Sequence, residues 1–219
     1  MRVFITGASG HIGSAVIPEL LNNGHQVVGL ARSDASAEAI AALGGEVRRG
    51  DLDDLDGLRQ TAAEADGVIH LAFKHEAMRA GDFMGAVGSD LAAIQAMGET
   101  LIGTDKPFVT TSGTLMLAMA GITGRPGTED DQSEGGPRVD AANYTIALAH
   151  EGVRSSVIRL APKVAPHYLG FLAAFAGFDN PTSNNKTREL LGWEPTHPSW
   201  VEDVEEGHCF SYPQIAKSS

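Results

Sequence analysis

Cysteine, clustered basic side chains and long apolar runs are all scarce in this sequence of 219 residues. The single cysteine, Cys209, has no partner for an intramolecular disulfide, which is typical of a protein from a reducing compartment. The formal net charge is −12, and no Lys or Arg cluster is present that would bind a phosphate backbone. We therefore expect a cytoplasmic protein that does not bind nucleic acid.

No apolar run approaches the roughly 20 residues that are needed to cross a bilayer. The longest candidate, residues 168–178, is interrupted by Gly170 and Gly177 and is expected to form a buried helix. The chain starts directly with a strand pattern rather than with a signal peptide, so no membrane partner is expected. Its eight histidines are scattered and no paired cysteines occur, so no metal site is expected either.

Short apolar runs alternate with helix-like segments along most of the chain. The expected strands are residues 3–6, 26–31, 47–49, 68–73, 108–111 and 156–160, and the expected helices are 14–22, 36–43, 55–65, 90–102 and 141–150. This alternation implies right-handed crossovers and a mostly parallel sheet with helices on both faces. The predicted fold class is therefore α/β, with a doubly wound sheet.

Two regions depart from the alternation. Residues 120–138 are rich in glycine and acidic residues and are expected to form a long exposed loop. After Pro162 the alternation stops, although residues 186–193 resemble a short helix that ends at Gly192. We predict a nucleotide-binding domain over residues 1–162 and a shortened C-terminal substrate-binding segment over 163–219.

The segment from Thr6 to Gly13, TGASGHIG, joins the first expected strand to the first expected helix. At such a turn Gly7 permits the tight bend, Gly10 allows the backbone to approach a pyrophosphate, and Gly13 lets the helix pack closely on the strand. The helix N-terminus then offers free N–H groups and the positive end of its dipole to the anion. The segment thus predicts a dinucleotide-binding site.

The second strand ends at Ala31-Arg32-Ser33, where the adenine ribose would lie. Arg32 can pair with a 2′-phosphate in a bidentate geometry and Ser33 can donate a further bond, which favours NADP(H). The less favoured alternative is that Arg32 is a solvated surface residue, and the nearby Asp34 keeps NAD(H) open. After the third strand, Asp51 can accept a hydrogen bond from the adenine amino group, or it can cap the helix that begins near Leu55.

Several segments together resemble the short-chain dehydrogenase/reductase superfamily, in the extended or atypical branch that includes the NAD-dependent epimerase/dehydratases. The resemblance covers about three quarters of the chain. Its motifs are TGASGHIG at 6–13, GDL at 50–52, HLAF at 70–73, VTTSGT at 109–114, VIRLAP at 157–162 and NNKTRELLGWEP at 184–195. It implies a Rossmann-like fold whose cofactor contacts are Gly7, Ser9, Gly10, His11, Ile12, Gly13, Arg32, Ser33, Asp51, Leu52, Leu71, Ala72, Phe73 and Pro162.

The resemblance also implies a Ser or Thr after the fifth strand and a Tyr four residues before a Lys, which lowers the tyrosine pKa. Ser112 or Thr114 matches the first role, although either can instead hydrogen-bond its own backbone. Leu148 follows Tyr144 at the lysine position, so Tyr144 is either a displaced acid or a half-buried core residue. Arg138 is a candidate positive charge near the nicotinamide.

A further departure from the family is that few residues separate the sixth strand from the C-terminal motif. Either the protein has lost part of the substrate lobe, or this sequence omits a segment of the natural molecule. We predict an NADP(H)-dependent oxidoreductase that transfers hydride to or from a small carbonyl or alcohol. The alternative is a non-catalytic dinucleotide-binding sensor or interaction protein. Relatives often pair through the helices expected at 90–102 and 141–150, which implies a homodimer.

Overall fold

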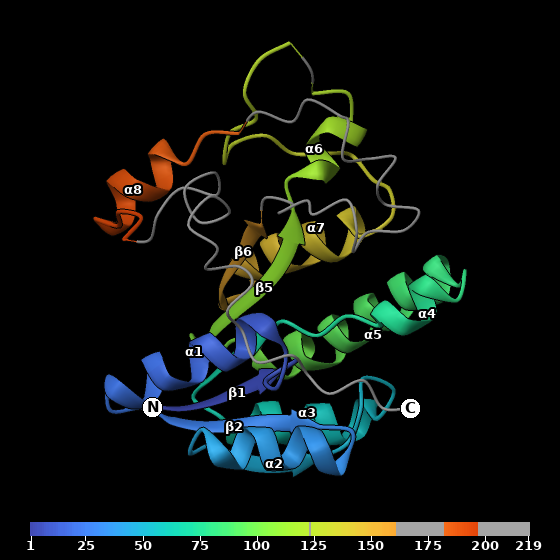
Figure 1. The fold of residues 1–219 in the computed structure, drawn as a ribbon. Helices are drawn as coiled ribbons and strands as arrows, with labels where there is room; N and C mark the ends of the chain where they lie inside the picture. Colours follow the sequence, from blue (N-terminus) through green and yellow to red (C-terminus); the bar gives the residue numbers. More distant parts are fainter. Residues whose placement is uncertain (123, 161–181, 197–219) are drawn as a thin grey trace, which may run out of the picture. The chain divides into compact units, whose positions relative to one another are not determined.

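The computed structural model describes residues 1–122, 124–160 and 182–196 (Figure 1). Its contacts divide the chain into two compact units. The first holds Met1–Met116 and Ser133–Leu160, and Leu117–Gln132 groups with the described C-terminal residues. The loop expected at 120–138 is therefore shared between the units. The domain boundary at residue 162 stays a prediction, and the helix expected at 168–178 lies outside the described residues.

A six-stranded parallel sheet forms the centre of the first unit, in the order β3-β2-β1-β4-β5-β6. The strand order reverses between β1 and β4, which pair directly. Ligands of doubly wound sheets bind where the order reverses, outside the carboxyl ends of the strands. The strands are β1 (Arg2–Thr6), β2 (Gln26–Ala31), β3 (Glu46–Arg49), β4 (Gly67–His70), β5 (Pro107–Gly113) and β6 (Arg154–Leu160). The predicted doubly wound fold is confirmed.

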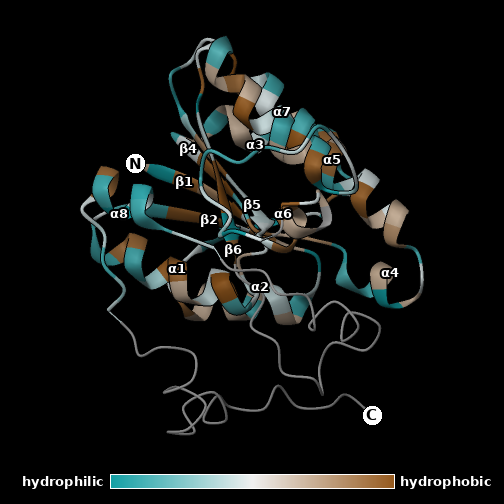
Figure 2. Ribbon diagram, turned by 90° about the horizontal axis from the view of Figure 1, so that it is seen from above, coloured by the Kyte–Doolittle hydropathy of each residue, from teal (hydrophilic) through white to brown (hydrophobic). Residues whose placement is uncertain are grey.

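Helices cover both faces of this sheet. They are α1 (His11–Asn22), α2 (Asp34–Ala42), α3 (Leu55–Glu64), α5 (Phe83–Leu101) and α7 (Val139–Ala147), which is followed by the 3₁₀ turn η1 (Leu148–Glu151). The short helix α4 (His75–Arg79) packs against α5. Figure 2 shows α1 and α2 on one side of the sheet and α3, α5 and α7 on the other. Successive β1 residues alternate between the two sides: Ile5 belongs to the core under α1 and α2, and Phe4 to the core under α3, α5 and α7.

Several expected boundaries differ from the structure, and two of them have a clear local reason. The strand expected at 68–73 ends at His70, because its partner β1 ends at Thr6 and the next residues bond to that end instead. The Leu71 N–H donates to the Thr6 carbonyl at 3.2 Å. The helix expected at 90–102 begins at Phe83, because the Asp82 side chain caps it by accepting the Gly85 N–H at 2.9 Å.

Two short helices, α4 and α6 (Leu115–Met119), lie in segments for which the sequence predicted no helix. Among the described residues of 120–138, neither helix nor strand is present until the chain reaches α7, apart from an isolated bridge from Gly127 to Thr182. This agrees with the loop predicted there.

The second unit contains α8 (Asn185–Leu191), close to the predicted helix at 186–193. It ends at Gly192, whose φ of 59° is left-handed. The acidic loop contacts its first turn: Glu129 accepts the Thr187 N–H at 2.8 Å, and Asp130 pairs with Lys186. In the part of the chain that the structure describes, no helix is long and apolar enough to cross a membrane.

Candidate functional site

In the glycine turn between β1 and α1, two positions, Gly7 and Gly13, leave no space for a side chain. Gly7 has a φ of 69°, and a Cβ added there would lie 2.7 Å from the backbone nitrogen of Ala72. A Cβ on Gly13 would lie 2.4 Å from the Gly7 carbonyl oxygen. Close backbone approach therefore requires a glycine at both positions, and the left-handed backbone at Gly7 requires it there a second time.

No side chain caps the N-terminus of α1. Gly10 is the N-cap and makes no side-chain hydrogen bond, and no acidic residue stands in the first turn. The positive end of the helix dipole is therefore left to an external anion. This arrangement fits the pyrophosphate that the glycine pattern predicted.

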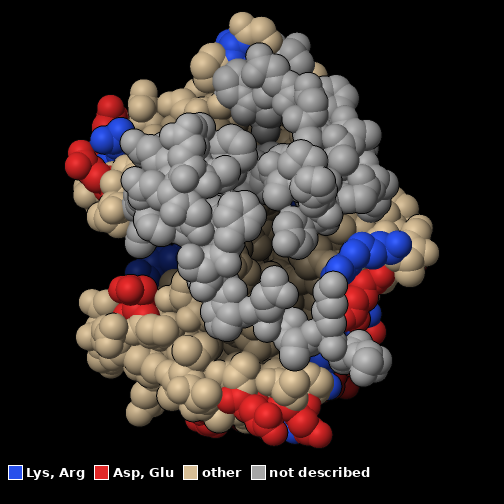
Figure 3. Space-filling model, in the orientation of Figure 1, with Lys and Arg blue, Asp and Glu red and all other residues tan. Residues whose placement is uncertain are grey.

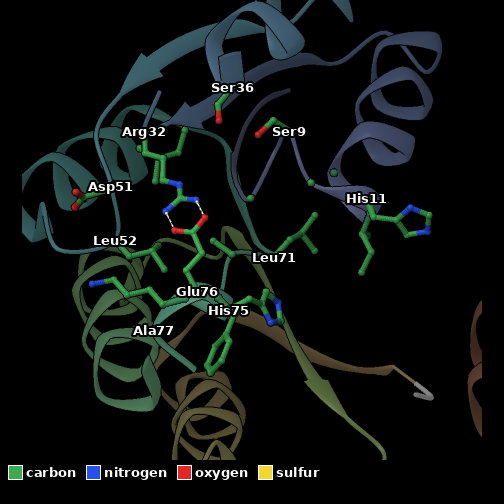
Figure 4. A pocket seen from close by; sticks show the side chains of 18 of the residues that line it. Ser9, His11, Arg32, Ser36, Asp51, Leu52, Leu71, His75, Glu76 and Ala77 are labelled. Atoms are coloured by element: carbon green, nitrogen blue, oxygen red, sulfur yellow. Dashed lines mark hydrogen bonds and ion pairs between the residues drawn. The ribbon is translucent and has the colours of Figure 1, made fainter. Parts of the chain in front are cut away.

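A cavity of about 710 Å³ opens beside this turn (Figure 4). Its volume falls in the range of about 300–1,000 Å³ that is usual for small-molecule sites. Four segments at the carboxyl ends of β1 to β4 form it, which is the edge at which doubly wound sheets bind ligands. The lining residues are Gly7, Ser9, Gly10, His11, Ile12, Gly13, Leu30, Arg32, Ser36, Gly50, Asp51, Leu52, Asp53, Leu71, Ala72, Phe73, Lys74, His75, Glu76, Ala77 and Arg79.

The structure brings most of the predicted cofactor contacts together in this cavity. Ser33 lies outside the lining and instead caps α2, because its side chain accepts the Ser36 N–H at 3.2 Å. Pro162 lies outside the described residues. The lining includes Gly7, Ser9, Gly10, His11, Ile12, Gly13, Arg32, Asp51, Leu52, Leu71, Ala72 and Phe73.

Asp51 faces the cavity and does not cap the helix after it. The cap of α3 is Asp54, whose side chain accepts the Gly57 N–H at 3.0 Å. Asp51 accepts the Asp53 N–H at 2.8 Å, which leaves its second carboxylate oxygen available to a ligand. Of the two roles weighed for Asp51, helix capping is therefore wrong.

The segment after β4 supplies lining residues that the sequence analysis missed. Lys74 donates to Asp53 at 2.6 Å, and this contact is the first cause that lowers the pKa of Asp53. Glu76 accepts hydrogen bonds from both terminal nitrogens of Arg32, at 2.6 and 2.8 Å. No sequence motif includes Lys74 or Glu76, and their partners Asp53 and Arg32 are distant in the sequence. Only the folded structure shows that these residues meet.

Phe73 lies between two nitrogen-bearing side chains at the cavity. The guanidinium carbon of Arg138 stands 4.2 Å from the centre of the Phe73 ring, and the His75 ring meets it edge-on at 5.2 Å. Burial, followed by the charges of Arg138 and Arg79, lowers the pKa of His75. His75 is therefore neutral at physiological pH and can both donate and accept a hydrogen bond.

A buried polar network lies behind this aromatic residue. His70 Nε2 is 3.1 Å from Asp90, and its Nδ1 is 2.8 Å from the Thr6 hydroxyl. Arg138 donates to the Thr111 carbonyl at 3.2 Å and places its Nε 3.7 Å from Asp90. That Nε is buried and makes no hydrogen bond. His70 is thus a packed residue, and Arg138 brings a positive charge to the ends of β4 and β5.

The three candidate catalytic residues lie outside the cavity lining. Ser112 on β5 and Thr114 just after it are buried. Tyr144 packs against the core at the contact of α5 with α7, where a Cβ on Gly98 would lie 3.1 Å from its ring. Burial raises the pKa of Tyr144, which is opposite to the shift that eases proton transfer near neutral pH. This location matches the core interpretation of Tyr144.

The chain is similar to known proteins in sequence and in structure. Residues 3–103 match the NAD-dependent epimerase/dehydratase family. An uncharacterised protein of Schizosaccharomyces pombe is 30% identical over 299 aligned residues, which cover 96% of this chain and all of the relative. Because this chain has 219 residues, at least 80 of the aligned positions have no counterpart in it.

A sterol-4-alpha-carboxylate 3-dehydrogenase (decarboxylating) of Dictyostelium discoideum is 39% identical over 34% of this chain and 23% of its own length. Among solved structures, a UDP-glucose 4-epimerase of Thermotoga maritima superposes with a TM-score of 0.60 at 17% identity, over 76% of this chain and 59% of that one. The chain thus spans less than two thirds of both, and the structural likeness concerns the fold.

Proposed function

Because this chain belongs to the NAD-dependent epimerase/dehydratase family, we propose that it is an oxidoreductase that uses NADP(H) to interconvert a small carbonyl compound and its alcohol. One observation carries the proposal: Arg32 lines the same cavity as the glycine turn. The turn suits a pyrophosphate, and a guanidinium at the end of β2 suits a 2′-phosphate. NAD(H) is the other cofactor compatible with the site.

Each part of the cavity has a proposed task. The glycine turn and the N-terminus of α1 hold the pyrophosphate, Arg32 the 2′-phosphate and Asp51 the adenine amino group. When bound, the cofactor supplies or accepts a hydride. Ser112 or Thr114 would bond the reacting oxygen. Both are at or just beyond the end of β5, beside the strand that carries the HLAF segment.

A second candidate function is a dinucleotide-binding protein without catalysis. It is favoured by the missing Tyr-x-x-x-Lys pair and by the positions of Ser112, Thr114 and Tyr144, which do not line the described cavity. The same fold and cofactor site would then serve sensing or partner binding.

A cytoplasmic location and a homodimer formed through α5 and α7 also stay predictions.

A binding assay followed by a turnover screen separates the two functions. NADPH and NADH are titrated by nicotinamide fluorescence, and NADPH consumption is then followed with a panel of aldehydes and ketones. Saturable binding with turnover of at least one compound supports the oxidoreductase. Saturable binding with none supports the sensor, and failure to bind either dinucleotide contradicts both.

A further inference from the structure

Arg32 and Glu76 form a bidentate ion pair at the cavity (Figure 4). Arg32 follows β2 and Glu76 lies on α4 after β4, so residues 44 positions apart meet through the fold. Their side chains are 63% and 67% exposed, so the pair lies at the open side of the cavity. The guanidinium atoms that suit a 2′-phosphate are thus already bonded to a carboxylate.

We propose that Glu76 is a specificity-determining residue that competes with the 2′-phosphate of NADP(H) for Arg32 and so limits the preference for NADP(H) over NAD(H). This inference rests on the proposed dinucleotide site. The planar fork of an arginine binds one bidentate anion through its two terminal nitrogens. A phosphate must therefore displace Glu76, or bind beside a negative charge that repels it.

NAD(H) meets no such penalty, because its ribose carries a neutral 2′-hydroxyl. A carboxylate near this position accepts hydrogen bonds from ribose hydroxyls, which is the usual basis of NAD preference. Arg32 and Glu76 thus act in opposite directions on the same part of the cofactor. The chain carries both a phosphate-binding cation and the anion that opposes it.

Neighbouring charges keep this competition in place over the pH range of ordinary assays. The hydrogen bond from Arg32 is the first cause that lowers the pKa of Glu76, and the charge of Arg79 acts in the same direction. Asp51 adds a further negative charge near Arg32. Glu76 therefore stays ionised, and mild acid does not release Arg32.

Removal of Glu76 from Arg32 requires only side-chain rotation. Glu76 is exposed on the five-residue helix α4, so no part of the core moves when it turns away. Exposed ion pairs are weak because water and salt screen them, so the expected effect of Glu76 on 2′-phosphate binding is only about two- to fivefold.

Two nucleotide probes that differ only in the 2′-phosphate isolate this effect. Adenosine 2′,5′-bisphosphate and adenosine 5′-monophosphate are titrated into the full chain by calorimetry. The Glu76→Gln variant is expected to bind the bisphosphate about two- to fivefold more tightly, with unchanged or weaker binding of the monophosphate. Glu76→Ala serves as a second variant in case the glutamine still accepts a bond from Arg32.

Glu38→Gln is the matched control for net charge. Glu38 is an exposed carboxylate on α2 and lies outside the cavity lining. Acidic side chains gather along the lower edge of the face drawn in Figure 3, which is where Figure 1 places α2. This control is expected to leave the ratio of the two affinities unchanged. In an Arg32→Ala background, the gain from Glu76→Gln should be smaller, because Glu76 no longer occupies the guanidinium that binds the phosphate.

The outcomes separate the inference from the proposed function. Equal tightening by Glu38→Gln and Glu76→Gln would overturn the inference in favour of a general charge effect, as would an unchanged affinity ratio in both Glu76 variants. If wild type and variants bind neither probe, the dinucleotide site itself is wrong and the inference fails with it.

Discussion

His70 on β4 and Asp90 on α5 form a polar pair in the interior of the first unit, with Nε2 3.1 Å from Oδ1 and side chains only 1% and 2% exposed. The Thr6 hydroxyl forms a hydrogen bond with the other ring nitrogen of His70, Nδ1. The pair fastens α5 to the end of β4, directly before the Leu71–Phe73 segment that lines the cavity. The floor of the site is thus positioned by buried polar groups as well as by apolar packing.

Replacement of Asp90 by Ala is expected to destabilise the protein strongly. It removes the acceptor of His70 and the carboxylate nearest to Arg138, and loss of one member of a buried polar pair costs about 3–5 kcal/mol. Urea denaturation measures the free energy of unfolding. Asp56→Ala, at a carboxylate that is 99% exposed, is the control and should change it by less than about 0.5 kcal/mol. Similar costs for the two variants would contradict a structural role for Asp90.

Gly13→Ala should abolish tight dinucleotide binding and lower stability by about 1–3 kcal/mol, because the new Cβ overlaps the backbone carbonyl of Gly7. Gly88→Ala is the control, since Gly88 lies within α5 and a Cβ there meets nothing within 4 Å. That change should raise stability by about 0.5–1 kcal/mol. Thermal unfolding and NADPH titration measure both effects, and unaltered NADPH binding by Gly13→Ala would speak against the turn as the pyrophosphate site.

His75 should make stability fall in mild acid. Its pKa in the folded state is lowered from 6.5, chiefly by burial. The unfolded chain therefore takes up a proton on His75 near pH 6.5 and the folded chain only at lower pH. The free energy of unfolding then decreases as the pH falls below about 6.5 and levels off below the folded-state pKa. For His75→Asn this decrease should be smaller, as measured by urea denaturation between pH 5 and 8. Parallel curves for the variant and the wild type would rule out this contribution of His75.

The parts of the site that the sequence predicted are those encoded by local pattern. Gly7, Gly13 and Arg32 stand at fixed places relative to apolar strands, and the six strands and the longer helices of the first unit follow from their periodicity. The error at the start of α5 came from capping by Asp82. Such boundaries depend on one side-chain bond rather than on a repeating pattern.

Pairings between distant residues could not be predicted in the same way. Glu76 meets Arg32 only because α4 follows the strand next to β1, and the five residues of α4 are too few to show a helical period. Arg138 reaches Asp90 through a backbone φ of 65°, which the sequence does not signal in a non-glycine residue. These contacts depend on tertiary structure, and one of them, between Arg32 and Glu76, places opposite charges at the cavity.

Calorimetric titration of NADPH and NADH into the wild type and the Arg32→Ala variant tests the central claim most directly. We expect one saturable NADPH site per chain in the wild type. The variant should bind NADPH at least tenfold more weakly, since a charged hydrogen bond contributes about 1.5–3 kcal/mol, and its affinity for NADH should change by less than about twofold. Equal losses for both dinucleotides would show that Arg32 does not bind the 2′-phosphate, and no saturable binding of either to the wild type would contradict the dinucleotide site altogether.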